Sequence, residues 1–518
     1  MSRRHGRGWS GLPAAGLLVL ALPARADLVL IEDGVCRVPI VVAAGAPAET
    51  VRAAEELAGY LGKIGGARPE VRTNGCGEAP GSAVWVGLQP GLAERFPGIA
   101  LAFEQPEEIL TACTGRDLLL AGRDRMAGSN LVEGGTANAV YTFLQRDLGV
   151  RWLWPGPLGE DVPRTNRLAL APFQYRHHPP FRMRAVFPRR VLAGRGAMAD
   201  WGRRQRLLYD SFDMDIGHAF DDWWDKYHAE HPEYFALQPD GTRSGFPAPG
   251  TAKLCEANAN VWAQWLADAA GALESRPAAR VVNAAPNDSS SSGICVCDAC
   301  RAWDSLDGPR YRLSWRGLSQ EYVAMTDRYI RFWNTLAGLL KARYPDREVY
   351  VSGMAYGPAR PPPVHAEPHP ALLIGYVGHF PMSGDDARAR EKEEWRQWAE
   401  RAPRLVYRPN LFWYSGGWSA LPTLVTRATM EDFRFLAEHR GMGLAVDSTP
   451  QYWATQGPQY YVMAQFAWDP FQDGAALLDD YYRRGFGPAA APVRRYFELM
   501  EEAHTAILNT PGWRHSMG

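Results

Sequence analysis

Two acidic residues directly follow apolar, strand-like runs, and their positions indicate catalytic chemistry. Asp288 ends the run that begins at Val281, and Asp447 ends the run that begins at Met442. Cleavage of a glycosidic bond needs two such carboxyl groups: one protonates the leaving oxygen, and the other forms a covalent intermediate or activates water. The amide of Asn287, beside Asp288, could hold a sugar hydroxyl or acetamido group. The same residues also fit an Asn-Asp turn and a helix N-cap, which carry no chemistry.

Polar and aromatic residues at other expected strand ends could line a sugar-binding cleft. His218 is the last residue of the segment Asp215-Ile216-Gly217-His218. A histidine there could donate to sugar hydroxyls or shift the pKa of a neighbouring acid. Flat aromatic rings suit the apolar faces of sugars, although each ring could equally pack in a core or at its rim. The further candidates are Tyr356, Tyr376, His379, Trp413, Tyr414 and Trp453.

Four cysteines form a separate group. Cys295, Cys297 and Cys300 lie within one turn region, and Cys255 could complete a set of four. Four thiolates are the usual ligands of a closed structural zinc site, whereas in an exported chain the same residues could form two disulfides. Neither arrangement leaves the open position that a catalytic metal needs. We therefore expect a structural clasp, with zinc and disulfides both open, and no cofactor required for catalysis.

The strands that position these residues follow a pattern typical of a (β/α)₈ barrel, here expected over residues 181–475. Such barrels carry their active sites at the carboxyl ends of the strands. A doubly wound sheet is the alternative, but no glycine-rich dinucleotide motif follows a strand, and no H-E-x-x-H, P-loop or G-x-S-x-G pattern is present. Helices are expected at Tyr322–Leu340 and over 476–518. The expected strands are Arg280–Asn283, Glu348–Ser352, Leu372–Tyr376, Leu405–Tyr407 and Met442–Val446.

A smaller α/β domain is expected before the barrel, over residues 27–165, because strand-like and helix-like runs alternate there. The proline-rich stretch from Pro163 to Pro180 predicts a linker. The expected elements are strands at Pro39–Val42, Ala83–Gly87 and Asp117–Ala121, and helices at Glu49–Ile64 and Ala137–Leu148.

Residues 1–26 have the pattern of an export signal. Basic residues precede a short apolar run from Gly11 to Leu22, and Ala24-Arg25-Ala26 offers a cleavage site. We therefore expect a periplasmic or secreted product with no membrane span. The formal net charge of −1 gives no general attraction to nucleic acid. The expected partner is a carbohydrate, and the oligomeric state is left open.

An ordered series of motifs resembles a bacterial family of domains of unknown function related to glycoside hydrolases, one branch of which is glycoside hydrolase family 163. The resemblance implies an N-terminal domain like those of α-glucuronidases and β-hexosaminidases and a (β/α)₈ barrel acting on glycans. For the characterised branch it implies endo-β-N-acetylglucosaminidase activity on complex N-glycans. The matching stretches are Gly134 to Leu144, Leu148 to Gly156, His231 to Phe235, Leu254-Cys255, Asn287-Asp288 with the C-x-C-x-x-C group, and Ala467 to Pro470.

These observations favour a retaining hydrolase of N-acetylhexosamine-containing glycans, with Asp288 as general acid/base and Asp447 as nucleophile or charge stabiliser. Where the family resemblance implies a glutamate, this chain has Asp447, whose carboxylate is retracted by about 1.5 Å. Attack by the substrate's own acetamido group is an alternative for the second acid. Two other hypotheses are a non-catalytic glycan-binding barrel and a hydrolase of uronic-acid glycosides, in which Arg184 or Arg408 would bind the substrate carboxylate.

Overall fold

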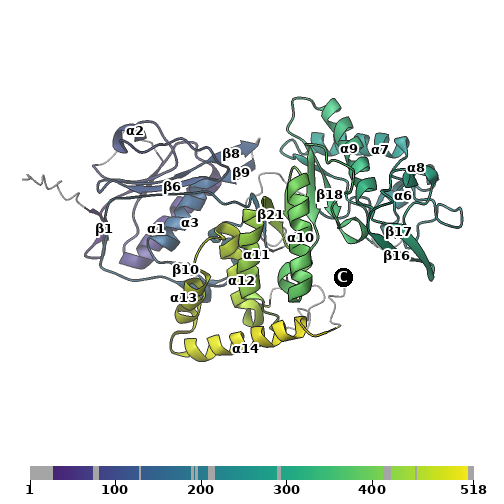
Figure 1. The fold of residues 1–518 in the computed structure, drawn as a ribbon. Coiled ribbons are helices and arrows are strands. Elements are labelled where there is room, and N and C mark those ends of the chain that lie inside the picture. The colour runs from purple at the N-terminus through teal and green to yellow at the C-terminus, as the bar shows by residue number, and fades with distance from the viewer. Residues whose placement is uncertain are drawn as a thin grey trace, which may run out of the picture.

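The computed structural model describes residues 27–73, 81–127, 130–187, 192, 196–207, 216–288, 293–411, 422–447, 449 and 452–511. Two six-stranded sheets organise these residues, one in the N-terminal part and one in the following part (Figure 1). Among the described residues, no helix combines the length and apolar character needed to cross a membrane.

The N-terminal sheet is mixed, in the order β13-β6-β7-β5-β3-β4. Helices α1 (Ala48–Gly65) and α3 (Gly135–Arg146) bury their apolar stripes on one face, and a cluster around Trp85 and Phe96 covers the other. Three predicted strands and both predicted helices of this part are confirmed. The strands are β3 (Ile40–Val42), β4 (Val71–Arg72), β5 (Val84–Val86), β6 (Ile109–Cys113), β7 (Leu118–Gly122) and β13 (Phe173–His177).

The stretch expected as a linker instead completes two sheets of the N-terminal part. Strand β12 (Arg167–Leu170) pairs antiparallel with β1 (Leu28–Glu32), and β13 pairs antiparallel with β6. Edge pairing satisfies backbone groups that a free linker would leave to water, and it outweighs the turn tendency of the flanking prolines. The remaining short strands are β2 (Val35–Cys36), β8 (Asp124–Ala127), β9 (Asn130–Gly134), β10 (Arg151–Trp152) and β11 (Glu160–Asp161).

The second sheet is parallel throughout and curls on itself, in the order β14-β21-β20-β19-β18-β15. The earliest strand of this sheet in the chain, β14, pairs with the last, β21, as the first and last strands of a barrel do. The described residues thus form a curled half-barrel, and a complete eight-stranded barrel is not established. The strands are β14 (Met183–Ala185), β15 (Val281–Asn283), β18 (Tyr350–Ala355), β19 (Leu372–Tyr376), β20 (Leu405–Tyr407) and β21 (Gly441–Ala445).

Helices follow most strands of this sheet and cover it. Each is amphipathic, and its buried apolar residues belong to the main core. These helices are α7 (Ala259–Ser275), α9 (Thr326–Arg343), α10 (Asp385–Arg401) and α11 (Thr426–Glu438). Shorter helices are α2 (Leu92–Arg95), α5 (Ala197–Arg204), α6 (Trp223–Tyr227) and α8 (Asp298–Arg301). Three helices, α12 (Trp453–Trp468), α13 (Gly474–Phe486) and α14 (Ala490–Leu508), complete the chain beside α11 (Figure 1).

The helix expected from Tyr322 begins later, at Thr326, because the residues before it form a hairpin. Strands β16 (Arg310–Trp315) and β17 (Leu318–Val323) pair antiparallel around Arg316 and Gly317. Both turn residues have positive φ, 44° and 80°, as a two-residue hairpin turn requires.

Candidate functional site

Asp288 lies at the carboxyl end of β15 and faces His218. Oδ1 of Asp288 is 3.9 Å from Nε2 of His218, and Nδ1 of His218 is 2.8 Å from the carbonyl oxygen of Pro286. Because a carbonyl only accepts, Nδ1 carries a proton and Nε2 is the ring atom that faces the acid. The Asp288 side chain is 59% exposed, so it can reach a bound molecule.

Asp447 lies at the carboxyl end of β21 and forms an ion pair with Arg408. Nη2 of Arg408 is 2.9 Å from Oδ2 of Asp447. The guanidinium also donates to Oδ1 of Asn410 at 2.6 Å and to the carbonyl oxygen of Ile216 at 3.3 Å. The ion pair therefore fixes an acid that is itself 46% exposed.

One short segment, Ile216 to His218, links the surroundings of the two acids. Ile216 accepts from the arginine that holds Asp447, and His218 faces Asp288. The carbonyl of Gly217, between them, accepts from Nδ2 of Asn283 at 3.1 Å. Three strands separate β15 from β21 in the sheet order, yet this segment reaches the ends of both. The two predicted acids consequently both lie where strands of the curled sheet have their carboxyl-terminal ends.

The amide of Asn287 is buried and bonded to backbone groups. Its Oδ1 accepts from the Phe220 nitrogen at 2.9 Å, and its Nδ2 donates to the Phe220 and Ala252 oxygens at 2.8 and 3.0 Å. Contact with a substrate would require these bonds to break. The geometry gives Asn287 the role of fixing the loop that carries Asp288.

Two predicted cleft residues, Tyr376 and His379, lie inside the protein instead. The Tyr376 ring packs edge-on against Trp395 of α10, and its hydroxyl donates to Oε2 of Glu394 at 2.9 Å. His379 is 2% exposed, and its backbone nitrogen donates to Oε2 of Glu391 at 2.7 Å. Tyr376 packs β19 against α10, because alternate residues of a strand point to opposite faces of the sheet, and His379 is held beside Glu391 of the same helix in the loop after β19.

Of the other aromatic candidates, the structure describes Trp453 and Tyr356. Trp453 begins the helix that follows β21, and it stacks on Phe187, which follows β14, with ring centroids 5.9 Å apart. It therefore lies near the end of the strand that precedes Asp447. Tyr356 is half-buried at the end of β18 and packs against the core. Trp413, Tyr414 and Asp215 lie outside the described residues.

Arg184, one of the two arginines considered for a substrate carboxylate, does not face a site. Its side chain is fully buried, and it binds both oxygens of Glu107 at 2.7 and 2.9 Å. This pair joins the N-terminal part to β14. Arg408 does lie at the strand ends, where Asp447 already engages it.

Lys253 belongs to the site region and is absent from the sequence predictions. Its ammonium is buried and donates to the carbonyl oxygens of Asn287 and Asp288. Burial lowers the pKa of Lys253 to about 8, although the charges of Asp288 and Glu256 oppose that change. The sequence feature that could have indicated this role is the position of Lys253 between apolar residues just before Cys255.

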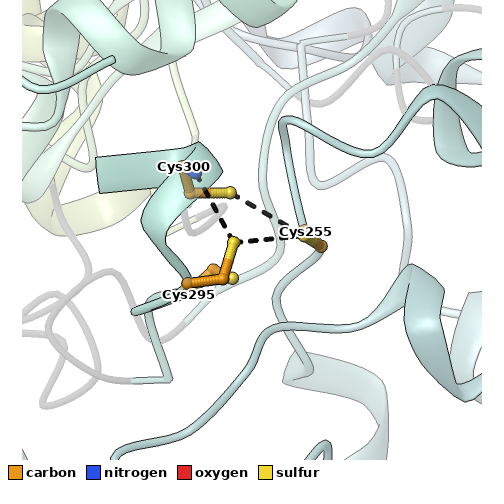
Figure 2. Close-up of side chains that lie close together, drawn as sticks. Cys255, Cys295 and Cys300 are labelled. Atoms are coloured by element: carbon orange, nitrogen blue, oxygen red, sulfur yellow. Dashed lines mark hydrogen bonds between the residues drawn. The ribbon is translucent and has the colours of Figure 1, made fainter. Parts of the chain in front are cut away.

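The four predicted cysteines converge. Their sulfur atoms all lie within 4.8 Å of one another. The Sγ atom of Cys255 is 3.7 Å from that of Cys297 and 3.8 Å from that of Cys300. Figure 2 shows the sulfurs of Cys255, Cys295 and Cys300 pointing toward one another. All four are free thiols in the structure.

The curled parallel sheet, with polar residues at its carboxyl edge, defines an α/β protein of the barrel-related class. The chain belongs to a family described as Domain of unknown function (DUF4838), whose sequence profile matches residues 154–498. No curated protein matches the chain.

Solved structures give a likeness of fold. A family GH115 4-O-methyl-α-glucuronidase, BtGH115A, described as specific for decorated arabinogalactans, superposes with a TM-score of 0.51 at 14% identity. The match covers 92% of this chain, and the chain spans 62% of the length of that enzyme. A β-hexosaminidase of Streptomyces plicatus has a TM-score of 0.45 at 13% identity, with coverage of 90% and 93% of the two chains.

Proposed function

We propose that this protein is a glycoside hydrolase that uses Asp288 and Asp447. The observation that carries this proposal is that both acids lie at the carboxyl-terminal ends of strands of the curled sheet. The Ile216–His218 segment contacts the surroundings of both. Both carboxylates are partly open to solvent, and each has a distinct basic partner. Paired acids in different surroundings are the chemical requirement for cleavage of a glycosidic bond.

The two acids take different roles. Asp288, next to His218 and the more exposed of the two, protonates the leaving oxygen. Asp447, held by Arg408, forms the covalent intermediate or stabilises positive charge on the sugar ring. If the substrate's acetamido group attacks instead, Asp447 orients that group. In a retaining enzyme the carboxyl groups stand about 5–5.5 Å apart, and in an inverting enzyme about 6.5–9.5 Å.

The substrate we propose is a glycan that contains N-acetylhexosamine. The support is the resemblance of the motif series, which includes Asn287-Asp288, to the family of which glycoside hydrolase family 163 is one branch. We also propose that the curled sheet belongs to a complete (β/α)₈ barrel, preceded by a domain like those of α-glucuronidases and β-hexosaminidases. Residues 1–26 would direct export to the periplasm or beyond.

Hydrolysis of a panel of substrates tests this function. The panel comprises N-glycans and aryl glycosides of N-acetylhexosamines, neutral hexoses and uronic acids. Release of an N-acetylhexosamine-terminated product supports the proposal, and proton NMR of the first product formed distinguishes retention from inversion. Cleavage confined to uronic-acid glycosides would replace the proposed substrate class. Binding of glycans without cleavage across the panel would favour a non-catalytic protein.

A further inference from the structure

We infer that Cys255, Cys295, Cys297 and Cys300 bind one structural zinc ion. In a tetrahedral site with Zn–S bonds of about 2.3 Å, neighbouring sulfurs are about 3.8 Å apart. In the structure the Sγ atom of Cys255 is 3.7 Å from that of Cys297 and 3.8 Å from that of Cys300. A disulfide requires about 2.05 Å between sulfurs. The spacing therefore favours four ligands around a metal over two disulfides.

Two chain segments bring the sulfurs together from different directions. Cys255 follows Leu254, which bridges to Phe235 in an antiparallel contact. Cys295 and Cys297 lie in the turn that leads into α8 and Cys300 lies in α8 itself, where its nitrogen is 3.5 Å from the sulfur of Cys297. The C-x-C-x-x-C segment thus supplies three of the sulfurs locally, and Cys255 joins them from a segment about 40 residues away.

Backbone donors point at the sulfurs as they do around metal-bound thiolates. The Leu237 nitrogen is 3.3 Å from the sulfur of Cys295, and the Ala257 nitrogen is 3.4 Å from that of Cys300. Hydrogen bonds of this kind orient the ligands and disperse their negative charge. They come from segments outside the turn, so the whole pocket is built around the four sulfurs.

A buried arginine supports the same cluster. Arg328 is 1% exposed and donates to the Cys295 carbonyl oxygen at 2.8 Å, while two bonds of 2.7 Å fix it to Asp304. Several thiolates in a buried pocket need positive charge for compensation. Zinc would supply two positive charges to the thiolates, whereas the charge of Arg328 is already paired with Asp304. Four thiolates also leave no open coordination position, so the site is structural and not catalytic.

The zinc site would act as a clasp for the loop that carries Asp288. Two residues before Cys255, Lys253 donates to the carbonyl oxygens of Asn287 and Asp288. Ala252 accepts from the amide of Asn287 at 3.0 Å. Fixing Cys255 to residues 295–300 would therefore also fix the loop after β15 that carries Asp288. Only this consequence for activity rests on the proposed function; metal binding does not.

Metal analysis of the purified full chain, without added metal or reductant, tests the inference. We expect about one zinc ion per chain, released by a mercurial reagent that titrates thiols. Replacement by cobalt(II) should give the absorption bands of tetrahedral thiolate coordination. Absence of zinc would overturn the inference, and so would disulfides among these cysteines in non-reduced peptide maps.

Two matched variants locate the metal. Cys297→Ser removes the most accessible of the four ligands and should abolish stoichiometric zinc and the cobalt spectrum. Cys36→Ser, at a half-buried thiol in the N-terminal part, should leave both unchanged. An unaltered cobalt spectrum in Cys297→Ser would contradict the assignment. Should that variant fail to fold, the zinc content of the unmodified chain still decides the question, and neither readout depends on glycoside hydrolysis.

Discussion

Arg408 and Asp447 follow neighbouring parallel strands, β20 and β21, and their side chains meet 2.9 Å apart at the edge of the sheet. The same guanidinium reaches the carbonyl oxygen of Ile216, two residues from the histidine that faces Asp288. A single arginine thus sets the position of one acid relative to the segment that contacts the other.

Arg408→Lys should lower kcat/KM by about 100-fold, because the single ammonium nitrogen of a lysine cannot reach all three acceptors that the three guanidinium nitrogens serve. The carboxylate of Asp447 would then shift by about 1 Å. Thermal stability should change little. Arg401→Lys, at an exposed position on α10, is the matched control and should leave the kinetics unchanged. Equal kinetics for Arg408→Lys and the unmodified protein would show that this ion pair does not position a reacting group.

His218→Asn separates the two contacts of the ring. An amide at this place can still donate to the Pro286 oxygen, while the atom that faces Asp288 is lost. We expect kcat/KM on glycans to fall by about 10- to 100-fold with an unchanged melting temperature. His228→Asn, at an exposed histidine, serves for comparison. A loss of stability without a kinetic effect would assign His218 a purely structural role.

Glu391 makes the stability of the protein depend on pH. Burial raises the pKa of this carboxyl. Hydrogen bonds and charge from His379, together with the charge of Arg360, lower the pKa by more, so it lies below the ordinary value of 4.5. The folded state therefore binds the proton less readily than the unfolded state. The resulting stabilisation is present above pH 4.5 and is lost as the pH falls through the folded-state pKa.

Glu391→Gln should accordingly cost about 1.5–3 kcal/mol of unfolding free energy at pH 7, with a smaller difference from the unmodified protein at pH 4. Urea denaturation at both pH values measures this. Glu393→Gln, an exposed pair partner on the same helix, should cost less than about 1 kcal/mol. A Glu391→Gln effect that grows toward low pH would refute the assignment.

The buried pair Arg184–Glu107 holds the N-terminal part on β14. Arg184→Met should destabilise the protein by about 3–5 kcal/mol, because Glu107 would be left as an uncompensated buried charge. Adding Glu107→Gln should recover part of this loss. Chemical denaturation compares these variants with Arg494→Met, which breaks a surface pair of helix α14. An effect of Arg184→Met no larger than that of the surface variant would count against the pair.

Buried parallel strands were the most predictable elements. Leu372–Tyr376 and Leu405–Tyr407 have the predicted bounds, because both faces of such strands are covered and the apolar run ends where the strand ends. The β16-β17 hairpin was missed, since Arg316-Gly317 is a weak turn signal. A strand end also does not reveal which way a ring points, and Tyr376 points toward α10.

The placement of the two candidate acids at strand ends could be predicted, but their partners could not. Asp288 and Asp447 stand out because each follows an apolar run. Arg408 and Ile216 are 192 residues apart, and Lys253 and Asn287 are 34 apart, so only the folded chain brings them together. The convergence of Cys255 on the C-x-C-x-x-C turn was predicted, because few buried sites other than a clasp require four thiols.

Steady-state hydrolysis of an N-acetylhexosamine-containing glycan by Asp288→Asn, Asp447→Asn and the unmodified protein tests the central claim most directly. Asp479→Asn, at an exposed acid of α13, is the control. We predict that both site variants lose at least about 100-fold in kcat/KM while the control keeps full activity. Asp288→Asn should recover on an aryl glycoside whose leaving group needs no proton. Full glycan hydrolysis by either site variant, with all four proteins folded, would contradict the account.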